Sequence, residues 1–419
     1  MRNNKMCALA LALLLSACSQ TPVVRPDMTS TPPTSGTAND PAEVSAEVLA
    51  TPDEVSTVQD TLATYQTRPL RPSLLSNAVS IDPGGTLSVA GESMFPMGFY
   101  HVSWAGTATR RLKDMNDIAA MGFNSMTVAM LDAVDDIGPM RKLVQAAHAK
   151  GMKLIIQDVN SQSVAALRNE PGILGWKVAD DCQINYTPEQ VAARAQVIKQ
   201  LDPTRLTYAS LGVSFSDPRS AYFGTTDATG NQIYPIGGGD GLSAVYRAMK
   251  ITVREALQKG VMPIGNVQSF RWSGQRMPTN AEVYNMTSQA LGAGVKGIMY
   301  YTYLDDSNDL SPQTSLRTEL KKVAGEVKQL TPILLHGERR ELLLSDTMHV
   351  VQWTYEGKRY LQVINVAYKS ITAQFKLPER GKAALPVFAN RPTGLKLQTD
   401  GLTVRGNMGA LAVHWYQVQ

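Results

Sequence analysis

The chain has 419 residues, of which 43% are hydrophobic and 18% are charged, and its formal net charge is +4. This composition predicts a folded chain with a large core, in one large domain or two, and excludes disorder throughout. The small, dispersed positive charge argues against a nucleic-acid partner. Three cysteines cannot build a disulfide framework, and no Cys/His spacing typical of zinc occurs, so we expect neither a metal nor another cofactor.

Residues 1–17 have the pattern of a bacterial export signal. A short basic start precedes an apolar run at 6–15, which is too short to span a bilayer as a mature helix. The tetrad LSAC at 15–18 resembles the lipobox of bacterial lipoproteins, which implies cleavage before Cys18 and lipidation of its thiol. An ordinary secretory signal with a chance cysteine is the alternative. Ser19 resembles outer-membrane sorting in a diderm cell, so we expect a lipid-anchored protein of the bacterial cell envelope.

Thr, Pro and Ser dominate residues 18–78, and little apolar periodicity occurs there. We expect a flexible tether with one short helix near 52–65. Cys7 would leave with the signal, and Cys182 would then be the only cysteine with a free thiol. A lone thiol is most simply a small, partly buried residue.

From residue 79 to residue 332, strand-like and helix-like segments alternate. The expected strands are 94–100, 124–128, 153–158, 173–179, 206–210, 230–235, 261–267 and 297–303. The expected helices are 108–121, 137–150, 161–168, 187–200, 242–258, 279–291 and 314–329. Eight alternating units predict a parallel sheet, and their length fits a (β/α)8 TIM barrel. A doubly wound open sheet is the alternative, but neither of its usual phosphate-binding glycine motifs is present.

In residues 333–419 the pattern of apolar residues changes to a period of two. Segments such as HVVQWTYEGKRYLQVINVA and LAVHWYQV are separated by Gly, Asn and Pro turns, which predicts a small antiparallel β-sandwich. The expected organisation is therefore a signal at 1–17, a tether at 18–78, a barrel at 79–332 and a sandwich at 333–419.

Reacting groups of a TIM barrel lie at the carboxyl ends of its strands, so residues that end or follow the strands form the candidate site. Aromatic rings stack on the C–H faces of sugars, while amides and carboxylates bind hydroxyl groups, and this mixture predicts a sugar-binding mouth. Core packing is the alternative for Trp176 and for the tyrosines. The candidate ligand contacts are Tyr100, His101, Trp104, Asn124, Gln157, Asp158, Trp176, Tyr234, Gln268, Trp272, Tyr301, Tyr303 and Asp305.

Several segments follow one another in an order that resembles clan-A glycoside hydrolases, among them FPMGFY, EPGILGWKVADD, LDPTRLTYAS and ALGAGVKGIMYYTY. The segment ILGWKVADD, with LDPTR after it, is similar to the GWxxxDEP segment of beta-galactosidase-like barrels. The resemblance covers roughly residues 80–330. It implies that Asp180 matches the family Asp and that Asp181 matches the glutamate that serves as general acid/base.

The sequence departs from that family pattern at two positions. Asp181 is one methylene shorter than glutamate, which changes its reach by about an ångström. Gln268 stands where retaining clan-A enzymes carry a nucleophilic glutamate, and an amide cannot act as nucleophile or base. Some relatives with a similar seventh strand also carry Gln there. The candidates for a second carboxylate are Asp158, Asp305 and Asp306.

The motif NEP at 169–171 also resembles a catalytic motif of clan-A enzymes. It precedes its strand and so belongs to the end of the barrel where residues serve stability, and we reject it as a site.

The resemblance implies a membrane-tethered glycoside hydrolase that acts on a poly- or oligosaccharide by carboxylate acid/base catalysis. One alternative is a non-catalytic glycan-binding lipoprotein that lacks the second carboxylate. Another is an envelope structural protein whose own loops fill the aromatic mouth. A carboxylate separation of about 5–5.5 Å would indicate a retaining enzyme and about 6.5–9.5 Å an inverting one.

Overall fold

The computed structural model describes residues 78–419 except Phe215 and Pro392, and these residues belong to one compact unit. The predicted signal, the lipidation site Cys18 and the short helix expected near 52–65 lie outside the described residues. Within the described part, no helix combines the length and the apolar character needed to cross a membrane.

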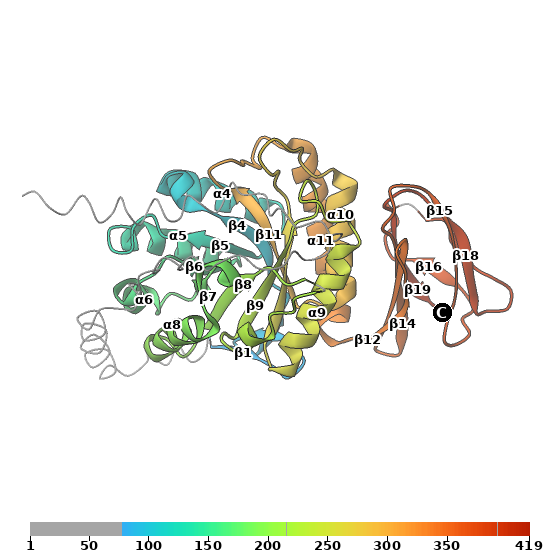
Figure 1. Ribbon diagram of the computed structural model, residues 1–419, viewed down its shortest axis with the longest axis horizontal. Helices are drawn as coiled ribbons and strands as arrows, with labels where there is room; N and C mark the ends of the chain where they lie inside the picture. Colours follow the sequence, from blue (N-terminus) through green and yellow to red (C-terminus); the bar gives the residue numbers. More distant parts are fainter. Residues whose placement is uncertain (1–77, 215, 392) are drawn as a thin grey trace, which may run out of the picture. The chain divides into compact units, whose positions relative to one another are not determined.

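Eight parallel strands close into a barrel (Figure 1). The strands are β4 (Met97–His101), β5 (Ser125–Ala129), β6 (Lys153–Gln157), β7 (Ile173–Ala179), β8 (Leu206–Leu211), β9 (Ala228–Ile233), β10 (Met262–Gln268) and β11 (Gly297–Leu304). They follow one another around the barrel in chain order, and β11 pairs with β4. The predicted TIM barrel is confirmed. An open doubly wound sheet is excluded, because this sheet has neither free edges nor a reversal of strand order.

Helices follow most of the barrel strands. They are α4 (Ala108–Ala120), α5 (Ile137–Ala149), α6 (Ser161–Leu167), α7 (Cys182–Asn185), α8 (Pro188–Leu201), α9 (Ala244–Gln258), α10 (Asn280–Ala293) and α11 (Thr314–His336), with short 3-10 turns η2 (Ser103–Ala105) and η3 (Ser220–Tyr222). Thr187 and Thr279, the first residues of two expected helices, form capping boxes at the starts of α8 and α10. Helix α11 extends beyond its expected end at residue 329, because Ile333, Leu334 and Leu335 bury their side chains.

A three-stranded antiparallel sheet lies at the amino end of the barrel. Its strands are β1 (Val79–Ile81), β2 (Leu87–Val89) and β3 (Glu92–Met94). Leu87 is fully buried and belongs to the same hydrophobic cluster as Ile155 and Met262 of the barrel interior. The first barrel strand was expected to begin at residue 94, but Pro96 separates β3 from β4, since proline cannot donate a ladder hydrogen bond. This sheet covers the end of the barrel opposite the candidate site.

Two antiparallel sheets follow the barrel, as predicted. One has the order β12-β13-β14-β19-β16, and the other has the order β15-β18-β17. Val363 and Tyr416 of the first sheet share a core with Phe375 and Val404 of the second. The strands are β12 (Glu338–Leu344), β13 (Met348–Tyr355), β14 (Lys358–Asn365), β15 (Ile371–Lys376), β16 (Ala384–Pro386), β17 (Leu395–Leu397), β18 (Thr403–Met408) and β19 (Val413–Val418).

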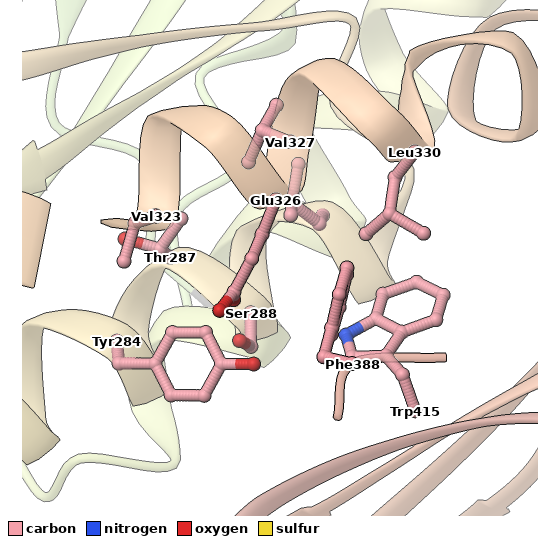
Figure 2. Close-up of a pocket in the computed structure, with 10 residues that line it drawn as sticks. Tyr284, Thr287, Ser288, Val323, Glu326, Val327, Leu330, Phe388 and Trp415 are labelled. Atoms are coloured by element: carbon pink, nitrogen blue, oxygen red, sulfur yellow. The ribbon is translucent and has the colours of Figure 1, made fainter. Parts of the chain in front are cut away.

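Buried polar contacts join this sandwich to α10. The Asn285 amide donates to the carbonyl oxygens of Asn365 and Leu411, both at 2.9 Å, and the Gln362 amide donates to the carbonyl oxygen of Ser288 at 2.8 Å. Figure 2 shows a small pocket close by, where side chains of α10 and α11 face two aromatic rings of the sandwich. Such buried contacts make the sandwich part of the same folded unit as the barrel.

Candidate active site

The carboxylate of Asp180, directly after β7, is the centre of the candidate site. Its Oδ2 lies 2.6 Å from the Lys177 ammonium group. Its Oδ1 accepts hydrogen bonds from the Gln232 amide at 2.9 Å, from the backbone N–H of Asp181 at 3.1 Å, and from the Ser210 hydroxyl. Donors of this number hold the carboxylate in one orientation, so Asp180 is suited to orient its neighbours.

Lys177 connects this centre to two other strands. Its side chain is only 1% exposed, and its ammonium group lies 4.2 Å from the centre of the Tyr100 ring and 3.2 Å from the Gln157 side-chain oxygen. Lysine is rarely buried without a partner, and the carboxylate, the ring and the amide together stabilise it here. The sequence analysis missed Lys177, Ser210 and Gln232. The sequence feature that could have identified Lys177 is the presence of a lysine within an otherwise apolar barrel strand.

A second polar layer lies beneath Lys177 in the barrel interior. The hydroxyl groups of Tyr100 and Tyr208 are 2.6 Å apart, and the Tyr208 hydroxyl also lies 3.0 Å from the Asn266 amide nitrogen. Tyr100, a predicted ligand contact, is only 1% exposed. Tyr100 therefore supports Lys177 from within the barrel.

Four aromatic rings from β9, β10 and β11 pack together at the carboxyl end of the barrel. This aromatic cluster consists of Tyr234, Phe270, Trp272 and Tyr301. Ring centres are 5.1 Å apart for Tyr234 and Phe270, 4.8 Å for Phe270 and Trp272, and 5.9 Å for Tyr234 and Tyr301. The Tyr301 ring also lies 5.5 Å from that of Tyr100, which connects the cluster to the Lys177–Asp180 centre. Three of the predicted contacts, Tyr234, Trp272 and Tyr301, thus pack together in one aromatic cluster.

Asp158 and Asp181 follow neighbouring strands and both have left-handed backbone conformations, with φ of 60° and 46°. Aspartate adopts this region more readily than most residues, because its short side chain can bond locally. Partial burial raises the pKa of the Asp158 carboxyl above its ordinary value; the charge of Asp180 adds to the rise, and Lys177 opposes it. The Gln157 amide donates to Asp158 at 3.4 Å. The ends of β6 and β7 therefore present several interacting carboxylates together.

Gln268 is the residue at the expected nucleophile position, and it is fully buried. Its side-chain oxygen accepts the N–H of Ile236 at 2.8 Å, while its amide donates to the carbonyl oxygens of Ile236 at 2.8 Å and Phe270 at 3.2 Å. These bonds brace the loop after β9 against the loop after β10. The structure does not bring Gln268 to the surface where a ligand would bind.

Trp176 and His101 were predicted as ligand contacts, but their side chains are buried away from the mouth. The Trp176 indole donates to Asp202, just after α8, at 2.9 Å. The His101 ring lies 3.1 Å from the carboxylate of Asp114 on α4. Alternate strand residues point to opposite faces, and these two point outward to the helices while Tyr100 and Lys177 point inward.

Asn124 and Tyr303 also lie away from the candidate site. Asn124 precedes β5, at the amino end of the barrel, where its side chain accepts the Met97 N–H at 2.8 Å and donates to the Phe95 carbonyl at 2.9 Å. Tyr303 is fully buried and packs edge-on against Phe99. Both residues support the barrel rather than the candidate site.

The remaining candidates lie on loops at the carboxyl end. Trp104, in η2 after β4, is 41% exposed and free to stack on a ligand. The Asp305 carboxylate accepts the backbone N–H groups of Ser307 and Asn308 at 2.7 and 2.6 Å, and so shapes its own turn. Partial burial raises the pKa of Asp306, and the adjacent Asp305 raises it further.

The fold defines the chain as a TIM barrel that is followed by antiparallel β-sheets. No family model matches the sequence, and no curated protein is similar to it. Solved structures are similar in fold. An Anoxybacillus alpha-amylase superposes with a TM-score of 0.56 at 14% identity, covering 81% of this chain and 99% of that one. A glycoside hydrolase of family 5 from Bacteroides vulgatus superposes with a TM-score of 0.55 at 13% identity, covering 82% and 94%. At this identity the likeness shows the fold alone.

Proposed function

We propose that this chain binds an oligosaccharide at the carboxyl end of its barrel and hydrolyses a glycosidic bond there. The observation that carries the proposal is the position of Asp181, directly after an Asp180 carboxylate that Lys177, Ser210 and Gln232 hold in place. A fixed carboxylate beside a second one, next to an aromatic cluster, provides both a sugar-binding surface and groups for acid/base chemistry.

In this mechanism the carboxyl group of Asp181 donates its proton to the glycosidic oxygen, and the bond from that oxygen to the anomeric carbon breaks. Asp158 takes a proton from a water molecule whose oxygen bonds to the anomeric carbon. The raised pKa makes Asp158 a stronger base than an ordinary aspartate. Proton exchange with solvent then restores both groups for the next turnover.

The binding of an oligosaccharide is also supported by similarity to sugar-bound structures. Crystal structures of AmyP in complex with maltotriose and with maltose superpose on this chain with TM-scores of 0.55 and 0.53, at 10% and 9% identity. Barrels of this architecture carry their sites at the carboxyl ends of the strands, which is where we propose that the sugar binds.

A binding protein without catalysis is the second candidate, and Gln268 favours it. In the family that the sequence resembles, this position carries the nucleophile, whereas here the amide is fully buried and bonded to backbone groups. A barrel in which this residue holds two loops together, instead of acting as nucleophile, can still bind a sugar without hydrolysing it.

A screen of the full-length protein against chromogenic glycosides and a glycan array tests both candidates, with Asp181→Asn and Asp158→Asn beside it. We expect turnover that each substitution abolishes while binding persists. Glu92→Gln, an exposed change on β3 at the opposite end of the barrel, is the matched control and leaves turnover intact. Binding without turnover in the unaltered protein would establish the second candidate, and the absence of both would remove the glycan proposal.

The membrane anchor is a separate proposal and rests on the lipobox-like tetrad ending at Cys18. Growth of expressing bacteria with a clickable palmitate analogue tests it. We expect label in the protein and its recovery with the membrane fraction, and loss of both in Cys18→Ser. Cys182→Ser, which alters the buried cysteine of α7, is the control that keeps both. Label that persists in Cys18→Ser would contradict the proposal.

A further inference from the structure

The loop after β10, residues 269–279, carries two rings of the aromatic cluster, Phe270 and Trp272, and it ends where α10 begins. Residue 271 and residues 273–276 of this loop are exposed, so core packing does not hold the part of the chain around Trp272. An exposed loop keeps one conformation where specific bonds fix it. The bonds of this loop therefore determine where the indole ring of Trp272 lies.

Arg276 supplies the strongest of these bonds. Its guanidinium group donates two hydrogen bonds to the carboxylate of Glu282 on α10, at 2.6 and 2.7 Å, in the paired geometry that these two groups favour. The same guanidinium group donates to the carbonyl oxygen of Met277 at 3.0 Å. The Glu282 side chain is only 1% exposed, whereas Arg276 is exposed. The buried carboxylate is therefore the fixed partner, and it holds the arginine and its loop.

Trp272 is joined to Arg276 by a tight turn. The N–H of Gln275 donates to the carbonyl oxygen of Trp272 at 2.9 Å, and the Trp272 indole donates to the carbonyl oxygen of Tyr234 at 3.3 Å. The turn packs closely on the loop after β9, because a Cβ atom on Gly237 would lie 2.8 Å from the Gln275 side chain. The bond of Arg276 to α10 therefore fixes the turn that places Trp272 against Tyr234.

The sandwich supplies a further donor to Glu282. Tyr368 lies between β14 and β15, and its hydroxyl donates to the Glu282 carboxylate at 2.7 Å, on the oxygen that also accepts the shorter Arg276 bond. The Tyr368 side chain is 59% exposed, so its position depends on this hydrogen bond more than on burial. One buried carboxylate thus joins the sandwich to the loop that carries Trp272.

Helix capping alone does not account for this arrangement. Glu282 forms a capping box with Thr279, and a capping box needs no more than the bonds between these two residues. Burial raises the pKa of Glu282, but the bonds from Arg276, Thr279 and Tyr368 outweigh it and lower this pKa to about 2. The carboxylate is therefore ionised at neutral and mildly acidic pH, and it keeps its charged partner there.

We infer that the sandwich is a working part of the candidate site, because it positions the loop that carries Trp272. Tyr368, Glu282 and Arg276 are positioning residues in this arrangement and act through the indole ring. The consequence for a ligand rests on the proposed function: a ring that is already fixed stacks on a sugar without first having to be ordered.

Fluorine NMR of the full-length protein labelled with 5-fluorotryptophan tests the positioning without any ligand. Trp272→Phe assigns the Trp272 resonance, and the resonance of the fully buried Trp176 is the internal reference. We expect Tyr368→Phe, which removes the hydroxyl, to shift or broaden the Trp272 resonance and to leave that of Trp176 in place. Tyr355→Phe, at the end of β13 in the same sandwich, is the matched control and leaves both resonances unchanged.

Two substitutions of Arg276 test the middle of the connection. Arg276→Gln should alter the Trp272 resonance more than Tyr368→Phe does, and Arg276→Lys, which keeps the charge but not the paired geometry, should restore it in part. The denaturant midpoint of Tyr368→Phe should stay that of the unaltered protein, because the side chain is largely exposed. A Trp272 resonance that neither Tyr368→Phe nor Arg276→Gln alters would overturn the inference. A lower midpoint with the Trp176 resonance also moved would overturn it too, since that result indicates general loosening.

Sugar binding tests the consequence for the site. With a glycoside that the unaltered protein binds or hydrolyses, Tyr368→Phe should raise Kd or KM about threefold or more and leave kcat within about twofold, because the ring holds the sugar and does not react. Binding that Trp272→Ala weakens and Tyr368→Phe does not would overturn the inference and leave the proposed function standing. If the unaltered protein binds no sugar, the proposed function fails, and the Trp272 resonance alone decides whether the sandwich positions the loop.

Discussion

The ammonium group of Lys177 lies 2.6 Å from the carboxylate of Asp180, yet the two side chains differ widely in exposure, 1% for the lysine and 40% for the aspartate. The pair is therefore asymmetric. The carboxylate can be solvated if its partner is lost, but the ammonium group cannot.

This asymmetry predicts unequal effects of the two single substitutions. Asp180→Asn leaves a buried charge without the carboxylate that contacts it, and should cost about 3–5 kcal/mol of unfolding free energy. Lys177→Met removes the buried charge and leaves a carboxylate with other donors, which should cost about 1–3 kcal/mol. Denaturant unfolding measures both. The double variant should recover part of the loss from Asp180→Asn, and equal costs for the two single variants would contradict the asymmetry.

Gln268→Glu tests whether the family nucleophile can be restored. The new carboxylate would be fully buried and would point an oxygen at the carbonyl oxygens of Ile236 and Phe270. We expect a loss of about 2–4 kcal/mol in unfolding free energy and no gain in glycosidase turnover. Denaturant unfolding and a chromogenic assay measure the two effects. A stable, more active variant would show that this position can reach substrate.

The barrel itself could be predicted from local patterns. Apolar runs bounded by caps such as Thr187 and Thr279 identify strands and helices, and eight repeats identify the closed sheet. The sandwich was predictable for the same reason, because its alternating residues form a core between two sheets.

The inward or outward direction of the strand side chains could not be predicted in the same way. Strand β7 shifts register against both of its neighbours, near its start against β6 and near its end against β8. Because of these shifts, counting alternate residues back from the strand end does not predict which side chains face the barrel interior. It therefore could not predict that Trp176 points outward and Lys177 inward. The role of Gln268 depends on Ile236, which follows a different strand and is close only in the folded chain.

His349 predicts a pH dependence of stability. The ring is fully buried, its two nitrogens have no partner among the described residues, and it lies 4.5 Å from the Tyr246 ring. Burial lowers the pKa of His349 to about 4, and the Arg247 charge adds to this, whereas Glu341 and Asp346 act in the opposite direction.

Because the unfolded histidine binds a proton below about pH 6.5, the unfolded state is favoured as pH falls from there to about 4. His349→Phe should remove up to about 1.4 kcal/mol per pH unit from the slope of unfolding free energy in this window. His148→Gln, on the exposed surface of α5, is the comparison: slight burial and the Lys153 charge also lower the pKa of His148, so we expect a smaller change of slope in the same direction. An unchanged slope in His349→Phe would show that this histidine is not responsible.

Asn285 predicts that the barrel and the sandwich unfold together. Its amide supplies two buried hydrogen bonds to backbone carbonyls of the sandwich, at 2.9 Å each. Asn285→Ala leaves both acceptors unsatisfied, so we expect a loss of about 2–4 kcal/mol in unfolding free energy. Asn116→Ala, which removes an exposed hydrogen bond within α4, is the matched control and should cost less than about 1 kcal/mol.

If the contact joins the two parts, the Asn285 variant shows one cooperative transition at lower denaturant, seen equally by tryptophan fluorescence and circular dichroism. A sandwich transition that moves while the barrel transition stays in place would show that the two unfold independently.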